Sequence, residues 1–245
     1  MFTKSLWGKI LDGMVRYGLK HPRVRKLVAR GHNLLACNCV RLRGGSLVQA
    51  AGAFLHHCKW DVEGPGNVVT IGSGAQLSGL KIFVRGCRNQ IQIGAECFFK
   101  SGSLWIEGEG CAIRIGPETT VEEAHLAASE GTAVEIGNDC MLAFGIDIRS
   151  GDSHAILDKT TGVRLNPAQN IFLKDHVWVA ANVQILKGVT IGAGSVIGTR
   201  SVVTHSVPAN AIACGVPARV VRTGVTWTRS IEQPAGIQDF TTNLH

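Results

Sequence analysis

Charged side chains, aromatic rings and long apolar runs are all scarce in this sequence, and each shortage excludes a class of protein. Charged residues make up 18% and aromatic residues 6% of the 245 residues, with a single tyrosine. Hydrophobic residues still reach 45%, which excludes a largely disordered chain. No apolar run approaches the roughly 18 residues of a transmembrane helix. Lys4, Lys9 and Asp12 interrupt the first apolar stretch, so no signal peptide is expected.

The cysteines lack the spacing of a metal site. None of the eight forms a C-x-x-C pair, so a zinc centre is not indicated. Several of them recur in a small-residue position of the repeat described below. The sequence therefore predicts reduced, buried thiols in a cytoplasmic protein.

Acidic residues are nearly absent from the N-terminal end. Residues 1–60 contain eleven Lys and Arg side chains but one acid, Asp12, while the formal net charge of the whole chain is +7. The remainder is therefore mildly acidic. This uneven distribution argues against a nucleic-acid partner and favours a basic appendage on a separate body.

A repeat built on isoleucine and glycine organises the rest of the chain. Ile71, Ile93, Ile115 and Ile136 are each followed by glycine and lie 22, 22 and 21 residues apart. Further on, aliphatic residues recur every six positions without a slip. These six anchors are Leu173, Val179, Ile185, Ile191, Ile197 and Val203.

A period of six predicts a parallel β-helix. Each hexapeptide forms one short strand and one corner, and three complete a coil of about 18 residues whose anchors stack into a continuous core. The glycine after an anchor is expected to allow the corner. The longer spacings predict coils with three or four extra residues looped out at a corner. An all-β solenoid is thus favoured over a β-sandwich with coincidental spacing, although the handedness does not follow from the pattern.

The repeat divides the chain into three parts. Residues 1–60 form a basic, partly helical N-terminal segment, 61–222 form the hexapeptide-repeat domain, and 223–245 form a C-terminal tail. The repeat is absent from 149–170, which predicts a long inserted loop of the kind that carries function.

The N-terminal segment contains an amphipathic helix. Phe2, Leu6, Ile10 and Met14 fall four residues apart among charged neighbours. Two interpretations stay open. The helix caps the first coil, since solenoid ends need covering, or it makes peripheral contact with an anionic membrane.

Four segments of the repeat region resemble a known family. They are Gly151-Asp-Ser-His154, Asp175-His-Val-Trp-Val-Ala180, Ile191-Gly-Ala-Gly-Ser-Val-Ile-Gly198 and Gly215-Val-Pro-Ala-Arg219. They resemble the hexapeptide-repeat acetyltransferases, in particular the O-acetyltransferases of capsular and other surface polysaccharides. The resemblance implies a left-handed parallel β-helix, a homotrimer, acetyl-CoA as cosubstrate and a glycan or sugar acceptor. Ala180 departs from the pattern, because relatives commonly have glycine there.

His154 is the candidate general base. Transfer of an acetyl group to an alcohol requires a group that removes the hydroxyl proton, and histidine does so near neutral pH. Asp152 is the candidate partner that orients the imidazole, with Asp158 and Glu135 as rivals. If His154 is not the base, His176 is the next candidate.

The resemblance also implies a cosubstrate groove between neighbouring solenoids of the trimer. Corner amides near Ala180 and Gly198-Thr199 would hold the pantetheine arm, and Trp178 would wall the thioester end or pack at the trimer seam. Lys187, Arg200 and Arg219 are candidates for the phosphates, because cations pair well with phosphate.

Three other functions stay open. An N-acetyltransferase of an amino sugar would use the same fold and base. A γ-type carbonic anhydrase would require three converging histidines, which the spacing does not provide, so no metal is expected. A non-catalytic solenoid is disfavoured by the Asp-Ser-His insertion. The expected location is the cytoplasm, with peripheral membrane contact as an option.

Overall fold

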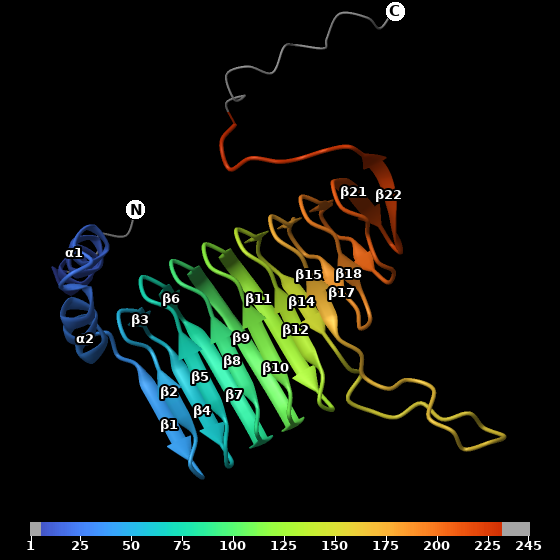
Figure 1. The fold of residues 1–245 in the computed structure, drawn as a ribbon, viewed down its shortest axis with the longest axis horizontal. Coiled ribbons are helices and arrows are strands. Elements are labelled where there is room, and N and C mark those ends of the chain that lie inside the picture. The colour runs from blue at the N-terminus through green and yellow to red at the C-terminus, as the bar shows by residue number, and fades with distance from the viewer. Residues whose placement is uncertain (1–5, 232–245) are drawn as a thin grey trace, which may run out of the picture.

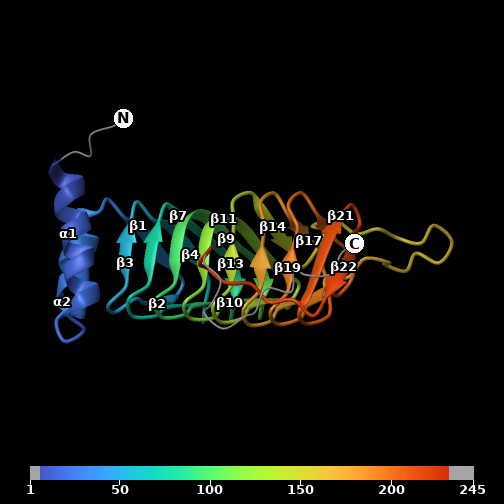
Figure 2. The ribbon, with the colours of Figure 1, turned by 90° about the horizontal axis from the view of Figure 1, so that it is seen from above.

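The computed structural model describes residues 6–231 and shows a parallel β-helix with two helices at its N-terminal end (Figure 1). Seen from above, the coils stack into a straight rod (Figure 2). Strands of successive coils pair in parallel and form three faces. The first face comprises β3 Phe54–His56, β6 Gln76–Ser78, β13 Met141–Leu142, β16 Trp178–Val179, β19 Val196–Ile197 and β21 Ala211–Gly215.

The other two faces follow the same principle. The second face comprises β1 Cys39–Arg43, β4 Lys59–Glu63, β7 Leu80–Cys87, β14 Ile146–Arg149, β17 Gln184–Ile185 and β20 Val202–Val203. The third comprises β2 Leu47–Gln49, β5 Val68–Ile71, β8 Gln90–Ile93, β10 Ala112–Ile115, β12 Ala133–Ile136, β15 Ile171–Leu173 and β18 Thr190–Ile191. Two long strands, β9 Phe98–Glu109 and β11 Thr120–Ser129, continue from the first face onto the second. The last strand, β22 Ala218–Thr223, turns back antiparallel to β21.

The predicted anchors all face one lumen. Each of the six hexapeptide anchors is at most 2% exposed, and all belong to a single hydrophobic core. Burial of these side chains from water drives the coils to stack. The prediction of a hexapeptide solenoid is therefore confirmed.

The extra residues of the longer coils are not looped out at a corner, as the sequence had suggested. They lengthen the strands of the second face instead. Residues 80–87 of β7 pair in unbroken parallel register with residues 102–109 of β9. Because every added residue keeps its ladder hydrogen bonds, widening the face satisfies the backbone without a loop.

The glycines after the anchors have a different role from the expected one. A Cβ on Gly94 would lie 2.3 Å from the backbone nitrogen of Pro117, and one on Gly116 would lie 2.5 Å from the carbonyl carbon of Gly137. Neither glycine has a positive φ. These positions therefore require glycine because neighbouring coils approach closely, not because the corner is left-handed.

The parallel strands begin earlier than the predicted boundary at residue 61. The helices α1 Leu6–Lys20 and α2 Arg25–Leu35 are followed by β1, which pairs with β4 from Cys39 onward. The repeat signal is missing there because β1 is exposed along its length, so no buried anchors mark it. Phe2 and Lys4, which the sequence placed in the helical segment, lie outside the described residues.

The helices pack on the first face beside β3. Gly18 of α1 lies against the ring of Phe54. The Asn33 side chain accepts from the amide of Leu55 and donates to the carbonyl of Ala53. Arg25 forms an ion pair with Glu96 at 2.5 Å. Neither helix is long and apolar enough to cross a bilayer.

Four cysteines are buried as predicted. They are Cys58, Cys97, Cys111 and Cys140, and each carries a free thiol. Burial raises the pKa of Cys58, Cys97 and Cys140 to about 11, so these thiols are unreactive at neutral pH. Cys37 and Cys39, which precede the repeat, are exposed.

Candidate functional site

The inserted segment forms a hairpin-like arm that projects from the solenoid between β14 and β15 (Figure 1, Figure 2). Leu157 and Arg164 form an antiparallel bridge, and the Leu165 amide donates to the Ile156 carbonyl at 2.8 Å. At the tip, the Asp158 carboxylate accepts from the amides of residues 160 and 161. Asp158 thus closes the turn of the arm and does not point to His154.

Asn166 fixes the base of the arm. Its side chain is 7% exposed, and its amide nitrogen donates to the Asp152 carboxylate and to the His154 carbonyl, each at 2.8 Å. Its amide oxygen accepts from the Ile156 amide at 2.6 Å. The backbone at His154 is therefore held in place by a buried amide.

The His154 ring itself is exposed. Within residues 6–231 the imidazole makes no hydrogen bond, while the His154 amide donates to the Asp152 carbonyl at 2.8 Å. A fixed backbone with a free ring leaves both imidazole nitrogens accessible to a ligand.

Asp152 does not contact the ring that it was predicted to orient. Its carboxylate accepts hydrogen bonds from Lys187 and Asn166. The Lys187 contact, supported by Asn166, holds the pKa of Asp152 below its usual value. The reason for the difference is local: Ser153 has a φ of 64°, which turns the chain between the two side chains. The rival Glu135 instead pairs with Arg114 on the third face.

The residues predicted to bind the cosubstrate fall into two places. The corner between the first and second faces brings together Ala180, Gly198, Thr199 and Arg200 in consecutive coils. The Ala180 amide donates to the Ile197 carbonyl at 2.9 Å, and the Arg200 amide and the Thr199 hydroxyl both donate to the Ala181 carbonyl.

Two further predicted residues border this corner. Trp178 precedes it on β16 and is half-buried. Arg219 lies on β22, opposite Cys214, and is exposed. Lys187 lies elsewhere, at the base of the arm, where it binds Asp152 and the Asn166 carbonyl. Lys187 thus contacts the arm and is not grouped with the other two cations.

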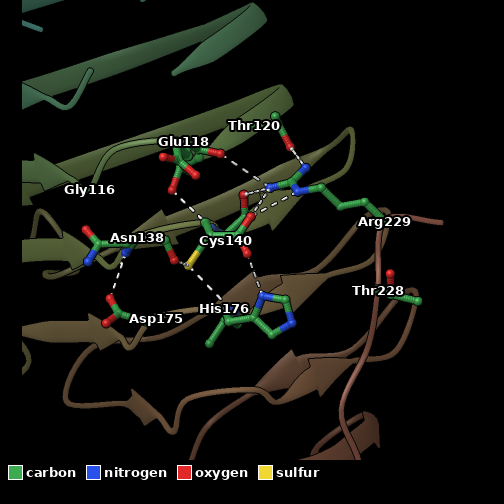
Figure 3. A network of polar contacts seen from close by, with 12 residues as sticks. Gly116, Glu118, Thr120, Asn138, Cys140, Asp175, His176, Thr228 and Arg229 are labelled. Carbon is green, nitrogen blue, oxygen red and sulfur yellow. Dashed lines mark hydrogen bonds and ion pairs between the residues drawn. The ribbon is translucent and has the colours of Figure 1, made fainter. Parts of the chain in front are cut away.

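His176 belongs to a third place, which the sequence did not reveal (Figure 3). Its Nδ1 lies 2.7 Å from the Asp139 carboxylate, and its Nε2 lies 3.0 Å from the Trp227 carbonyl. The rings of His176 and Trp227 stack with centroids 4.1 Å apart. With both nitrogens engaged, His176 is poorly placed to serve as a base.

The tail after β22 returns along the rod and is fastened by this cluster. Arg229 donates to Asp139 at 3.0 Å and to the Thr120 hydroxyl at 2.9 Å. Figure 3 shows Arg229 reaching Thr120 from the tail. Trp227 is 8% exposed. The tail predicted at 223–245 is therefore held to the solenoid at Trp227 and Arg229, while Ile231 is fully exposed and residues 232–245 lie outside the described part. No local sequence pattern predicts the contact between His176 and Trp227, because the two residues are 51 positions apart.

Comparison with known proteins identifies the family. The family model described as bacterial transferase hexapeptide (six repeats) matches residues 170–205. The solved structure of the polysialic acid O-acetyltransferase OatWY superposes with a TM-score of 0.76 at 26% identity, covering 82% of this chain and 98% of OatWY. The polySia-specific acetyltransferase NeuO superposes with a TM-score of 0.70 at 30% identity, covering 80% and 90%. The chain belongs to the hexapeptide-repeat acetyltransferases.

A curated member of this acetyltransferase family gives a narrower match. The polysialic acid O-acetyltransferase of Escherichia coli O1:K1 / APEC is 34% identical over 122 residues. The match covers 50% of this chain and 40% of the relative's length. The family assignment confirms the recognition from sequence and the left-handed parallel β-helix. Between residues 6 and 231, no group of three or more His, Cys, Asp or Glu side chains is arranged to hold a metal ion.

Proposed function

We propose that this hexapeptide-repeat acetyltransferase moves the acetyl group of acetyl-CoA to a hydroxyl of a surface polysaccharide or its precursor. The observation that carries the proposal is the superposition of about four fifths of the chain on two enzymes that acetylate polysialic acid. Since both cover the solenoid and share its sequence at 26% and 30% identity, a common reaction is a more economical explanation than a common fold alone.

His154 is the general base of the proposed reaction. Its imidazole takes the proton of the acceptor hydroxyl as the oxygen attacks the thioester carbonyl. The tetrahedral intermediate collapses to an acetyl ester, and the leaving CoA sulfur takes the proton back from the imidazolium. Asp152 acts by holding the base of the arm through Lys187 and Asn166.

The corner formed by Ala180, Gly198, Thr199 and Arg200 is the proposed place for the pantetheine arm. The amides of Ala180, Gly198 and Arg200 already donate to neighbouring coils, so the amide-containing pantetheine arm would pair with carbonyl oxygens at this edge of the coils. Arg200 and Arg219 are exposed cations beside the corner and would meet the phosphates. Trp178 borders the same corner and would shield the thioester from water.

A homotrimer would complete this groove, and the arm supports such an assembly. Four large apolar side chains on it are each more than half exposed: Ile156, Leu157, Val163 and Leu165. Projecting apolar surface of this kind marks a protein–protein contact. Light scattering on the purified chain tests the assembly, and a monomer at micromolar concentration would contradict it.

A location in the cytoplasm with peripheral membrane contact is the corresponding proposal for the helices. Leu27 and Leu34 of α2 are 74% and 80% exposed, beside the cations Lys26 and Arg30. Exposed apolar and basic side chains on one short helix favour the surface of an anionic bilayer. Sedimentation with anionic vesicles, compared with neutral vesicles, tests this contact.

The test of the reaction is direct. The purified full chain is incubated with acetyl-CoA and polysialic acid, neutral galactosides or amino sugars, while the release of free thiol is followed. Acetyl groups that mild alkali removes are esters, whereas an amide product would favour the N-acetyltransferase alternative. Absence of acceptor-dependent thiol release across this panel would contradict the proposal.

A further inference from the structure

A hollow of about 360 Å³ lies on the second face, next to the arm. Its floor is Ala127 of β11, which pairs with Trp105 of β9 on one side and with Arg149 of β14 on the other. Because paired strands are about 4.8 Å apart, the two large side chains stand roughly 10 Å apart above an alanine methyl group. That width accommodates one six-membered sugar ring.

Trp105 provides a rigid aromatic wall for the hollow. The indole is 38% exposed and stacks on Phe83 with ring centroids 4.0 Å apart. The Arg85 guanidinium lies over the far side of Phe83, 4.1 Å from its centroid. Since Phe83 covers one face of the indole from the N-terminal side, the other face turns toward Ala127. A flat ring held in this way offers a large contact area at low entropic cost.

Polar groups complete the hollow. The remaining walls include Ser129, Glu107 and the ring of His125, whose Nδ1 lies 2.6 Å from the Ser103 hydroxyl. Burial, reinforced by the charge on Arg149, lowers the pKa of His125 and keeps its ring neutral. Arg149 donates to Asp147 through Nε. An apolar wall with a few converging donors and acceptors is typical of a small-ligand site.

The hollow opens toward the candidate base. Gly151 and Ser153 form its rim, and His154 is the next residue along the arm. We propose that this hollow is a saccharide subsite, in which one pyranose unit of the acceptor glycan lies with its C–H face on Trp105 while a neighbouring unit meets His154. The inference rests on the proposed function for the second unit, whereas binding of the first requires only the hollow. The acceptor is therefore an oligomer of at least two sugars.

Filling the hollow tests the subsite. Ala127→Phe adds a ring where the sugar would lie, and Ala127 is outside the lumen, so the core is untouched. Trp105→Ala removes the wall, and Trp105→Phe restores a ring. Thr70→Phe is the matched control, because Thr70 is a half-buried outward position on β5 of the third face.

Two measurements separate the subsite from the reaction. Binding of sialic acid and galactose oligomers is titrated without acetyl-CoA, and the acceptor KM is measured separately from kcat and the KM for acetyl-CoA. Ala127→Phe should weaken glycan binding and raise the acceptor KM on the order of tenfold or more, and Trp105→Ala about three- to tenfold. Values of kcat and of the acetyl-CoA KM should stay within about twofold. Trp105→Phe and Thr70→Phe should resemble the wild type.

The outcomes are distinct for the two proposals. A wild-type protein that binds oligosaccharides but releases no thiol contradicts the reaction and retains the subsite. Unchanged binding and acceptor KM in Ala127→Phe overturns the subsite while the reaction stands. Dissociation of the oligomer in Ala127→Phe and Trp105→Ala, measured by sedimentation, would make the hollow a subunit seam and overturn it as well. A wild-type protein that binds no oligosaccharide also overturns it.

Discussion

The two halves of the solenoid enclose one continuous core, but the N-terminal coils use more residues per coil than the C-terminal coils. In the C-terminal coils each face receives six residues, and strands such as β17 and β20 are two residues long. In the N-terminal coils the strands of the second face are longer, and β7 has eight residues, which pair with residues 102–109 of β9. Core side chains are equally buried in both halves, and the longer strands of the second face add buried side chains such as Val84 and Ile106 as well as outer surface.

The boundary between the halves coincides with the candidate site. The second face narrows from β11 to the four-residue strand β14, and the arm leaves the solenoid directly after β14. His154, the hollow over Ala127 and the base formed by Asn166 all lie at this step. The broad coils thus offer surface for a long acceptor, while the narrow coils offer closely spaced corners for the cosubstrate.

The largest expected effect comes from His154, which lies at the boundary between the broad and the narrow coils. His154→Ala should lower kcat about a hundred- to ten-thousandfold, because general-base catalysis is worth that much. The fold and the affinity for acetyl-CoA should change little, since the ring is exposed. His205→Ala, which removes another exposed histidine from the narrow coils, is the control. Near-normal turnover of His154→Ala with a good acceptor would remove this mechanism.

The next largest effect concerns the hydrogen bonds that hold the base of the arm. Asn166→Ala removes the amide that anchors His154 and Asp152, and misplacement of a reacting group costs about ten- to a hundredfold in kcat. Asp152→Asn should cost less, because Asn166 still bonds the His154 carbonyl. Asn170→Ala is the control, since Asn170 bonds the third face instead. Equal kinetics for Asn166→Ala and Asn170→Ala would show that the anchor is dispensable.

A third effect tests why coils need glycine after their anchors. Gly94→Ala forces a methyl group onto the backbone of Pro117 and should destabilise the fold by about 1–3 kcal/mol. In α1 the surroundings of Gly13 are open, so Gly13→Ala should stabilise by about 0.5–1 kcal/mol. Denaturant unfolding measures both. A neutral Gly94→Ala would indicate that neighbouring coils move apart easily.

The sequence predicted the narrow coils better than the broad ones. The six anchors from Leu173 to Val203 follow from stacking alone, which repeats at every coil. A spacing of 22 residues fits either a corner loop or a longer strand, and the loop interpretation was wrong. The alternation of Leu80, Ile82 and Val84 contained the signal for a long strand.

The candidate site could likewise be predicted only in part from the sequence. His154 stood out because it lies in an interruption of the repeat. Its relation to Asp152 depended on side-chain direction, which the left-handed backbone at Ser153 reverses. Asn166 gave only a weak signal, as an asparagine before proline at the end of the insertion. Trp227 and His176 meet across 51 residues, and sequence proximity carries no information about such contacts.

The smallest expected effect concerns the fastening of the tail across the narrow coils. Burial raises the pKa of Asp139, but hydrogen bonds from His176 and Arg229 outweigh it, so the pKa lies below the usual 3.8. A carboxyl group with a depressed pKa in the folded state stabilises above its ordinary pKa, and this stabilisation is lost as the pH falls through the depressed value. The tail should therefore stay attached at neutral pH and loosen only below about pH 3.8. Since the Asp139 side chain is 41% exposed, the contribution should be about 1 kcal/mol or less.

Hydrogen exchange of residues 224–231, corrected for intrinsic rates, measures how firmly the tail is attached. Asp139→Asn should show the loosened tail already at neutral pH. Asp158→Asn at the tip of the arm is the control. Protection of the tail that is unchanged in Asp139→Asn would show that Trp227 alone holds it.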